Sequence, residues 1–463
     1  MTPKPIPGML TLNALAAAVA HGQIDTVLTT FPDLYGRLLG KRMAARYFLD
    51  HVAEGGTHVC DYLLACDMEM DPVPGYRFAS WEAGYGDLHA VPDLSTLRQT
   101  SWLPGTALVL CNLLTEPGDQ PVEVAPRRML QRQLEHAQSA GFTVMGGTEL
   151  EMYVFNETYD TARAKGYRGL QTASAYMEDY HIFQGTREEG LLRAIRLGLD
   201  GSGVPIESTK GEWGPGQQEI NLRYCDALTQ ADRATLCKHG AREIAHLQER
   251  AVTFMAKWDE KTAGSGLHVH VSLWDLEGNQ NRFAGDTPLG SVHGSDAFRW
   301  FLGGLMTHSY ELTALFAPYV ASYKRFQAGS FAPTGIAWSA DNRTAGFRVV
   351  GHGPSLRVEC RIPGADANPY LVYAAVLAAG LEGIRAHIEP PPPFTGDVYQ
   401  AQNLPHIPGS LRDSIAALEG SEMARRAFGT DVVEHYLHFL RTEQRKFDEV
   451  VTDWEKSRFF ERI

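Results

Sequence analysis

Four stretches of the sequence alternate apolar side chains with glutamate, histidine or arginine. Successive side chains point to opposite faces of a β-strand, so this period of two predicts strands with one apolar and one polar face. Solvated strand faces usually carry Lys, Thr and Ser, whereas these faces carry residue types that bind metals and phosphate. The four stretches are 149–155, 217–224, 267–273 and 357–362.

The polar faces predict a site for cations. Glu149 and Glu151 project from one face about 6–7 Å apart, and two carboxylates so placed repel each other unless a cation lies between them. Any one of these strands alone fits a plain solvent-exposed face. Together they favour a curved, mainly antiparallel sheet with helices behind it and a metal-loaded polar face. The aligned polar side chains are Glu149 and Glu151; Gln217, Glu219, Asn221 and Arg223; His268, His270 and Ser272; Arg357, Glu359 and Arg361.

The residue types indicate the metal and the reaction. Carboxylate oxygens, with His268 as the favoured nitrogen, suit Mg²⁺ or Mn²⁺ better than zinc. Arginine forks bind carboxylate and phosphate, and metal ions combined with many arginines favour phosphoryl transfer. The carboxylates are Glu149, Glu151, Glu212, Glu219 and Glu359, and the arginines are Arg325, Arg343, Arg348, Arg357 and Arg361.

Composition excludes several classes of protein. The net charge of −13 argues against a nucleic-acid scaffold or a protein that binds anionic membranes. No apolar run reaches the roughly 18 residues of a membrane span. The six cysteines are scattered without a CxxC pair, which favours a reducing compartment and no structural zinc. We therefore expect a cytoplasmic enzyme, and we interpret 12–20 as an amphipathic helix rather than as a signal-peptide core.

Turn-forming residues and prolines suggest where helices, strands and domains end. The turn at 116–119 separates a strand-rich part from a part that starts with a helix, and four prolines at 390–393 end another helix. The length of 463 residues allows two or three domains. Predicted strands lie at 26–30, 36–40, 107–110 and 142–146, and predicted helices at 126–140, 371–379, 411–418 and 430–448.

These motifs, in this order, resemble the glutamine synthetase superfamily over nearly the whole chain. The motifs that carry the resemblance are 33–37 (DLYGR), 149–151 (ELE), 212–219 (EWGPGQQE), 264–270 (GSGLHVH), 322–325 (SYKR), 342–344 (NRT), 357–361 (RVECR) and 368–370 (NPY). The resemblance implies an α+β fold with a small N-terminal β-grasp domain, 1–115, and a larger catalytic domain, 116–463. It also implies a homo-oligomeric ring, commonly a dodecamer, and ATP-dependent joining of glutamate to an amine through γ-glutamyl phosphate.

The resemblance also implies roles for individual residues. Two to three Mg²⁺ or Mn²⁺ ions would be held by Glu149, Glu151, Glu212, Glu219, His268 and Glu359. The nucleotide would contact Tyr224, His270, Ser272 and Arg357, and glutamate would contact Gly264, Arg325 and Arg361. Arg343 and Arg348 would act in phosphate transfer, and Asp33 would act on the site of a neighbouring subunit as base or cation anchor.

Departures from the family pattern point to the acceptor. Ammonia-using members carry a glutamate six positions after the arginine of SYKR, and here that position is Phe331. Ala263 and Asp341 also depart from the pattern. The phrases 325–327, 341–344 and 364–370 resemble the γ-glutamylamine ligase branch, so we expect an organic primary amine as acceptor, such as a polyamine or ethanolamine. Glu178 and Asp179 are candidate partners of a second ammonium group.

Two other functions stay open at this point. An ammonia-using glutamine synthetase would need a carboxylate where Phe331 stands. A non-catalytic structural or nitrogen-sensing relative usually lacks metal ligands, whereas all six matching positions are filled here. The sequence does not identify the amine.

Overall fold

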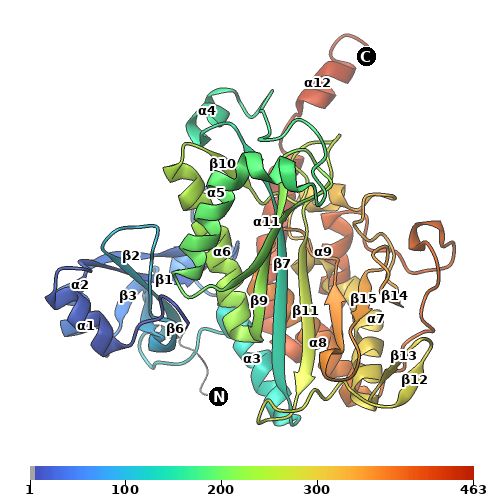
Figure 1. Cartoon of the computed structure of the whole chain (residues 1–463), viewed down its shortest axis with the longest axis horizontal. Coiled ribbons are helices and arrows are strands. Elements are labelled where there is room, and N and C mark those ends of the chain that lie inside the picture. The colour runs from blue at the N-terminus through green and yellow to red at the C-terminus, as the bar shows by residue number, and fades with distance from the viewer. Residues whose placement is uncertain (1–5) are drawn as a thin grey trace.

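The four strands with polar faces lie side by side in one sheet of the computed structural model, which describes residues 6–463 (Figure 1). The order of the sheet is β14-β15-β16-β11-β7-β9-β8, with β10 paired to β7, and only β14 and β15 run parallel. This confirms the predicted, mainly antiparallel sheet. Its strands are β7 (Thr143–Phe155), β8 (Ile206–Gly211), β9 (Gln217–Asp226), β10 (Ala251–Thr253), β11 (Leu267–Trp274), β14 (Trp338–Ala340), β15 (Phe347–Val350) and β16 (Arg357–Cys360).

The register of this sheet brings the charged side chains together across strands. On β7, Glu149 lies opposite His268 and Asn221, and Glu151 lies opposite Glu219. On the other side of β11, Glu359 is paired with His270 and then with Arg348. Side chains opposite each other on one face are close neighbours, so the site follows from the strand pairing.

Helices cover the apolar face of the sheet. Helix α8 (Pro369–Ala386), with the predicted buried segment 371–379, packs with α3 (Pro126–Ser139) and α6 (Ala227–Leu247) against it. An outer layer is formed by α5 (Ile182–Asp200) on α6 and by α7 (Asp296–Phe316) on α8. The remaining helices of this part are α4 (Tyr159–Ala164), α9 (Leu411–Glu419), α10 (Glu422–Phe428), α11 (Thr430–Asp448) and α12 (Asp453–Phe459).

A second, mixed sheet forms the N-terminal part, on the left in Figure 1. Its order is β2-β1-β6-β4-β3, with β5 paired to β6, and β1 and β6 are parallel. The strands are β1 (Thr26–Pro32), β2 (Leu38–Ala44), β3 (Thr57–Cys60), β4 (Asp87–Pro92), β5 (Arg98–Gln99) and β6 (Thr106–Thr115). The short hairpin β12 (Thr287–Leu289) and β13 (Val292–Gly294) completes the strands.

Strand alternation places the N-terminal sheet between two cores. Leu15 and Val19 of α1 (Leu12–Ala20) pack with Val27 of β1 on one face, which confirms the predicted helix. The next residue, Leu28, joins the core of the larger sheet on the other face. A short helix, α2 (Ala45–Tyr47), follows β2. The α+β fold is thus confirmed, while the division at residues 115 and 116 stays a prediction.

Two sequence predictions need correction at their ends. The strand expected at 36–40 begins only at Leu38, because Gly36 adopts a left-handed turn (φ +77°) in which a Cβ would lie 3.2 Å from the Asn368 side chain. The strand expected at 142–146 is the first part of the single long strand β7, which continues through 149–155.

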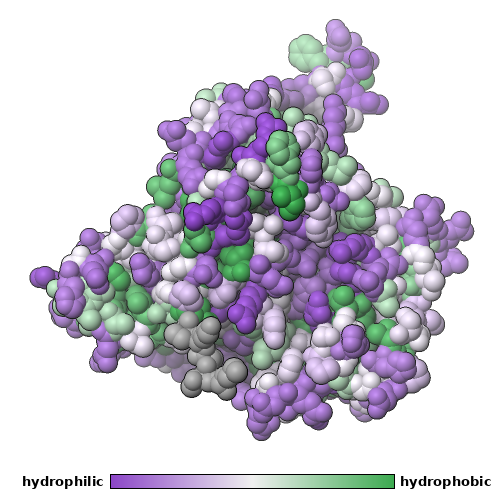
Figure 2. All heavy atoms as spheres, viewed as in Figure 1, coloured by the Kyte–Doolittle hydropathy of each residue, from purple (hydrophilic) through white to green (hydrophobic). Residues whose placement is uncertain are grey.

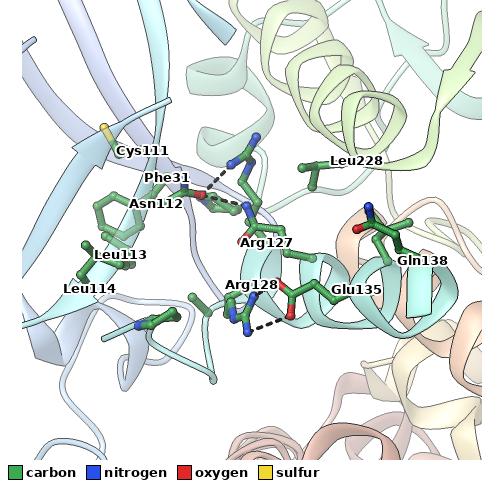
Figure 3. Close-up of a pocket in the computed structure, with 15 residues that line it drawn as sticks. Phe31, Cys111, Asn112, Leu113, Leu114, Arg127, Arg128, Glu135, Gln138 and Leu228 are labelled. Atoms are coloured by element: carbon green, nitrogen blue, oxygen red, sulfur yellow. Dashed lines mark hydrogen bonds and ion pairs between the residues drawn. The ribbon is translucent and has the colours of Figure 1, made fainter. Parts of the chain in front are cut away.

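A buried charge cluster attaches the N-terminal sheet to the rest of the protein, and Figure 3 shows its Arg127 beside Asn112. The Arg127 guanidinium, at the start of α3, donates to both oxygens of Asp232 on α6 at 3.0 Å. It also donates to Asp93 at 2.8 Å and to Asn112 of β6 at 2.6 Å. A cavity of about 410 Å³ lies beside this cluster, between β6 and α3.

Two further findings concern the chain as a whole. In the residues that the structure describes, no helix is both long and apolar enough to cross a membrane. All six cysteines are free thiols.

The face shown in Figure 2 is largely hydrophilic, with apolar residues in scattered patches.

Candidate active site

Two adjoining cavities open on the polar face of the larger sheet. The first, of about 450 Å³, contains most of the predicted metal, glutamate and phosphate residues. The second, of about 550 Å³, contains Tyr224 and Ser272. Both are lined by Glu149, Asn221, His270 and Arg357. One continuous site therefore runs along the strands β7, β9 and β11.

Carboxylates and histidines form three overlapping groups in this site. Within each group, potential ligand atoms lie within 4.8 Å of one another. His268 links the groups, because its Nδ1 lies 3.4 Å from Glu149 and 3.6 Å from Glu359, and its Nε2 lies 3.9 Å from Glu151. The groups are Glu149, His270 and Glu359; Glu149, Glu219 and His268; and Glu151, Glu212 and Glu219.

The charges of these carboxylates are not balanced at one end of the site. Burial and repulsion from Glu149 and Glu212 raise the pKa of Glu219 to about 9, and burial with repulsion from Glu212 raises the pKa of Glu151. A divalent cation between such carboxylates would remove this repulsion. The oxygen-rich donor set therefore fits Mg²⁺ or Mn²⁺.

At the other end, histidines and arginines already balance the charge. Burial acts to raise the pKa of Glu149, but hydrogen bonds with His268 and His270 outweigh it and hold the pKa well below its usual range. Glu359 is fully buried, and Arg361 and Arg348 both donate to it. Burial acts to raise the pKa of Glu359, but the charge of Arg361 outweighs this effect, and the pKa falls to about 2.

Glycines and a glutamine hold Glu151 in position. The Gly266 amide donates to Glu151 Oε2 at 2.7 Å, and the Gln217 amide donates to the same oxygen at 3.2 Å. Gly264 packs on the Arg325 side chain so closely that a Cβ there would lie 2.6 Å from Arg325 Cγ. Close packing around Arg325 therefore leaves no room for a side chain at position 264, which explains the glycine there.

Arginines surround the first cavity. Arg325 is buried and donates to the backbone carbonyls of Ile362 and Arg361, at 2.9 and 3.2 Å. Arg343 is exposed, and Arg348 is bound by Asp341 and Glu359. Asp341, one of the departures from the family pattern, therefore positions Arg348. The arginines that line the cavity are Arg325, Arg343, Arg348, Arg357 and Arg361.

A β-bulge in β9 corrects one prediction from alternation. Two residues of β9, Arg223 and Tyr224, face the single residue Gly147 of β7, so the side-chain alternation of β9 shifts at this point. Tyr224 therefore comes to the same cavity as Asn221, and Arg223 lines neither cavity. Regular alternation had placed Arg223 with Asn221, and a bulge leaves no mark in the pattern of residue types.

Aromatic side chains form the remaining wall of the first cavity. The rings of Trp213 and Phe331 meet edge to face with centroids 5.3 Å apart, and they are 47% and 42% exposed. Phe331 has φ +59°, a conformation that is unusual for a bulky residue and common at functional positions. Tyr180, from the loop before α5, lines the same cavity.

The two acidic candidates beside Tyr180 have different environments. Asp179 lines the first cavity. Glu178 is buried behind it, where it accepts from the Gly216 amide and from the Gln218 side chain. Glu188 of α5 accepts from the same Gln218 side chain at 3.0 Å. Only Asp179 is therefore placed to meet a molecule in the cavity.

The structure thus brings together nearly all the predicted residues. Glu359 adjoins the cavities through Glu149 and His270 without lining them, because it is fully buried. Asp33 lines neither cavity of its own chain: it is 2% exposed, and Arg37 Nε donates to its carboxylate at 2.7 Å. Its predicted role on a neighbouring subunit stays a prediction.

Sequence reasoning missed several residues of the first cavity, among them Lys210, Trp213 and Tyr180. Lys210 is on β8 and is paired in register with Glu219. A pattern could have found it, since Ser208, Lys210 and Glu212 alternate with the same period as the other polar faces and all three line the cavity. Trp213 and Tyr180 lie in loops, where no periodicity exists.

Known proteins are similar to this chain over nearly its whole length. The family model described as "Glutamine synthetase, catalytic domain" matches residues 123–459. A γ-glutamylethanolamide synthetase of Streptomyces coelicolor is 48% identical over 454 residues, which are 98% of this chain and 96% of the relative. A glutamate–isopropylamine ligase of Pseudomonas is 35% identical over 443 residues, 95% of this chain and 96% of the relative.

Solved structures show the same fold. The ADP complex of GmaS superimposes with a TM-score of 0.84 at 28% identity and covers 96% of this chain and 99% of that one. GmaS without ligand gives a TM-score of 0.83 at the same identity and coverage.

Proposed function

The chain belongs to the glutamine synthetase family, and on that premise we propose that it uses ATP to join the γ-carboxylate of glutamate to an organic primary amine. The observation that carries this proposal is the combination of a cation-binding, arginine-lined cavity with an aromatic wall at Phe331. Two relatives are named for ligation of ethanolamine and isopropylamine, which are small monoamines. We assign an acceptor of that class to this chain.

The metal ions bind at the carboxylate and histidine groups. Glu151, Glu212 and Glu219 would hold one ion, and Glu149, His268 and Glu359 would hold another. Divalent ions held there would polarise the γ-carboxylate and neutralise charge on the transferring phosphate. The raised pKa values of Glu151 and Glu219 support this assignment, because they reflect burial and mutual repulsion that nearby cationic side chains do not offset.

The other residues bind and orient the two common substrates. Arg325, Arg361 and Gly264 bind glutamate in the first cavity. Tyr224, His270, Ser272 and Arg357 bind ATP in the second cavity, so its terminal phosphate lies where the two cavities meet. Arg343 and Arg348 stabilise the charge that develops on the phosphate during transfer.

Phe331 decides between an organic amine and ammonia. Bare ammonium is strongly hydrated and needs a carboxylate, whereas a ring offers apolar area and a π face to an alkyl ammonium. The contact of Phe331 with Trp213 supports the organic amine, since together they form an apolar wall in an otherwise charged cavity. The filled metal-ligand positions argue against a non-catalytic relative.

The active form is a homo-oligomeric ring. The C-terminal segment with α12 projects from the body of the protein (Figure 1). It exposes Trp454, Phe460 and Ile463, which are apolar residues that a neighbouring subunit would cover. In such a ring Asp33 serves a neighbour's site. Light scattering tests this proposal, and a fully active monomer would contradict it.

An amine panel tests the function itself. Purified protein with Mg²⁺, ATP and glutamate is assayed for phosphate release with ammonium, ethanolamine, isopropylamine, putrescine and spermine. The expected result is the highest kcat/KM for a small organic amine and no release without glutamate. The proposal fails if ammonium is the best acceptor or if no amine stimulates phosphate release.

A further inference from the structure

A lysine ammonium is part of the wall on which the acceptor amine is expected to bind. Lys210 Nζ contacts Glu212, lies 3.9 Å from Glu219 Oε1 and stands 4.5 Å from the centroid of the Tyr180 ring. The Lys210 side chain is only 19% exposed. These three contacts, from the turn between β8 and β9, from β9 and from the loop before α5, hold the ammonium in the cavity wall.

The same wall connects Lys210 to the aromatic pair. Glu212 binds Lys210 through one carboxylate oxygen, and its other oxygen accepts from the Trp213 amide at 3.3 Å. The Trp213 ring in turn contacts Phe331. Lys210, Trp213 and Phe331 therefore line the same cavity and are connected through Glu212.

We propose that Lys210 is a specificity-determining residue that restricts the acceptor to monoamines, because a second ammonium on the substrate would meet its fixed positive charge. This inference rests on the proposed function. Like charges in a partly buried site repel strongly, since water screens them less there than in bulk. A divalent ion on Glu212 and Glu219 would compete with Lys210 for these carboxylates, but it would also bring positive charge to the same wall.

Asp179 acts in the opposite direction but more weakly. It lines the cavity and could attract a second ammonium, yet it is exposed, and its charge is screened by solvent. Lys210 is held by two carboxylates and an aromatic ring. The cavity therefore accepts a chain that ends in a methyl or hydroxyl group more readily than one that ends in a charge.

The experiment compares two acceptors that differ only at the far end, propylamine and 1,3-diaminopropane. The measured quantity is the ratio of kcat/KM for the diamine to kcat/KM for the monoamine. We expect Lys210→Met to raise this ratio about tenfold or more, whereas Lys210→Arg, which keeps the charge, leaves it near the wild-type value. Asp179→Asn should lower the ratio slightly.

The ratio separates specificity from damage to the metal site, because a weakened metal site slows both amines alike. Titration with Mn²⁺, followed by its paramagnetic resonance signal, measures metal binding by each variant independently of activity. An unchanged or lower ratio in Lys210→Met, with the monoamine still used, overturns this inference alone. Failure of wild-type protein to use any amine overturns the proposed function instead.

Discussion

The replacement of Arg127 by leucine tests how the N-terminal sheet is attached. The Arg127 side chain is 4% exposed and binds Asp232, which is 3% exposed, through two parallel hydrogen bonds. Loss of one partner of a buried ion pair leaves the other charge uncompensated, which typically costs about 3–5 kcal/mol. Asp93 is 23% exposed and can be hydrated instead. We therefore expect Arg127→Leu to lower the free energy of unfolding by about 3 kcal/mol, near the low end of that range.

The next residue supplies a matched control. Arg128 starts the same helix turn and also binds two carboxylates, but its partners Glu123 and Glu135 are 39% and 55% exposed (Figure 3). Exposed pairs contribute about 0–1 kcal/mol. Arg128→Leu should therefore change the free energy of unfolding by less than about 1 kcal/mol.

Urea unfolding, followed by circular dichroism at one fixed protein concentration, measures both variants. A double variant, Arg127→Leu with Asp232→Asn, removes both buried charges and should recover part of the lost stability. Equal destabilisation by Arg127→Leu and Arg128→Leu would refute the reasoning, and so would a double variant less stable than Arg127→Leu.

Three further predictions concern the site. Glu219→Ala should reduce turnover by orders of magnitude because it removes a metal ligand, and near-wild-type phosphate release at ordinary Mg²⁺ would exclude that role. Phe331→Glu should raise the ratio of kcat/KM for ammonium to kcat/KM for ethanolamine. The expected rise is about 2- to 30-fold, because a ring contact with an alkyl ammonium contributes about 0.5–2 kcal/mol. An unchanged ratio would mean that the ring does not select the acceptor. Burial and the nearby Glu178 raise the pKa of Glu188 from 4.5 to about 8, so the folded protein retains a proton that the unfolded chain releases. The contribution of Glu188 to stability is fully present below pH 4.5 and is lost as the pH rises toward 8. The loss is at most about 1.4 kcal/mol per pH unit. The Tm of Glu188→Gln should then fall less than that of wild type between pH 6 and pH 9, and parallel curves for the two proteins would contradict this explanation.

The sequence predicted the strands of the site well and its loops poorly. Alternation identified Glu149, His268 and Glu359 because strand geometry allows only two side-chain directions, so a period of two assigns each residue to a face. The register, by which Glu151 lies opposite Glu219, depends on contacts between segments far apart in the chain and carries no local pattern. The bulge at Tyr224 is invisible for the same reason.

Loop residues escape such reasoning entirely. Phe331 was found only because it departs from a family motif, and its left-handed backbone could not be foreseen. The acidic pair at 178 and 179 had equal standing in the sequence, yet one carboxylate is buried against Gln218 and the other lines the cavity. Which of two adjacent side chains faces a cavity in a loop is decided by packing alone.

The separate origins of the two halves of the cavity have an evolutionary consequence. Most residues of the proposed metal and nucleotide sites stand on the paired strands β7, β9, β11 and β16, where a change disturbs several neighbours at once. In the proposed acceptor wall, Tyr180, Trp213 and Phe331 stand in three loops that carry no strand pairing, while Lys210 stands on β8. A lineage can therefore acquire a new amine by substitutions in these loops while phosphate activation is inherited unchanged.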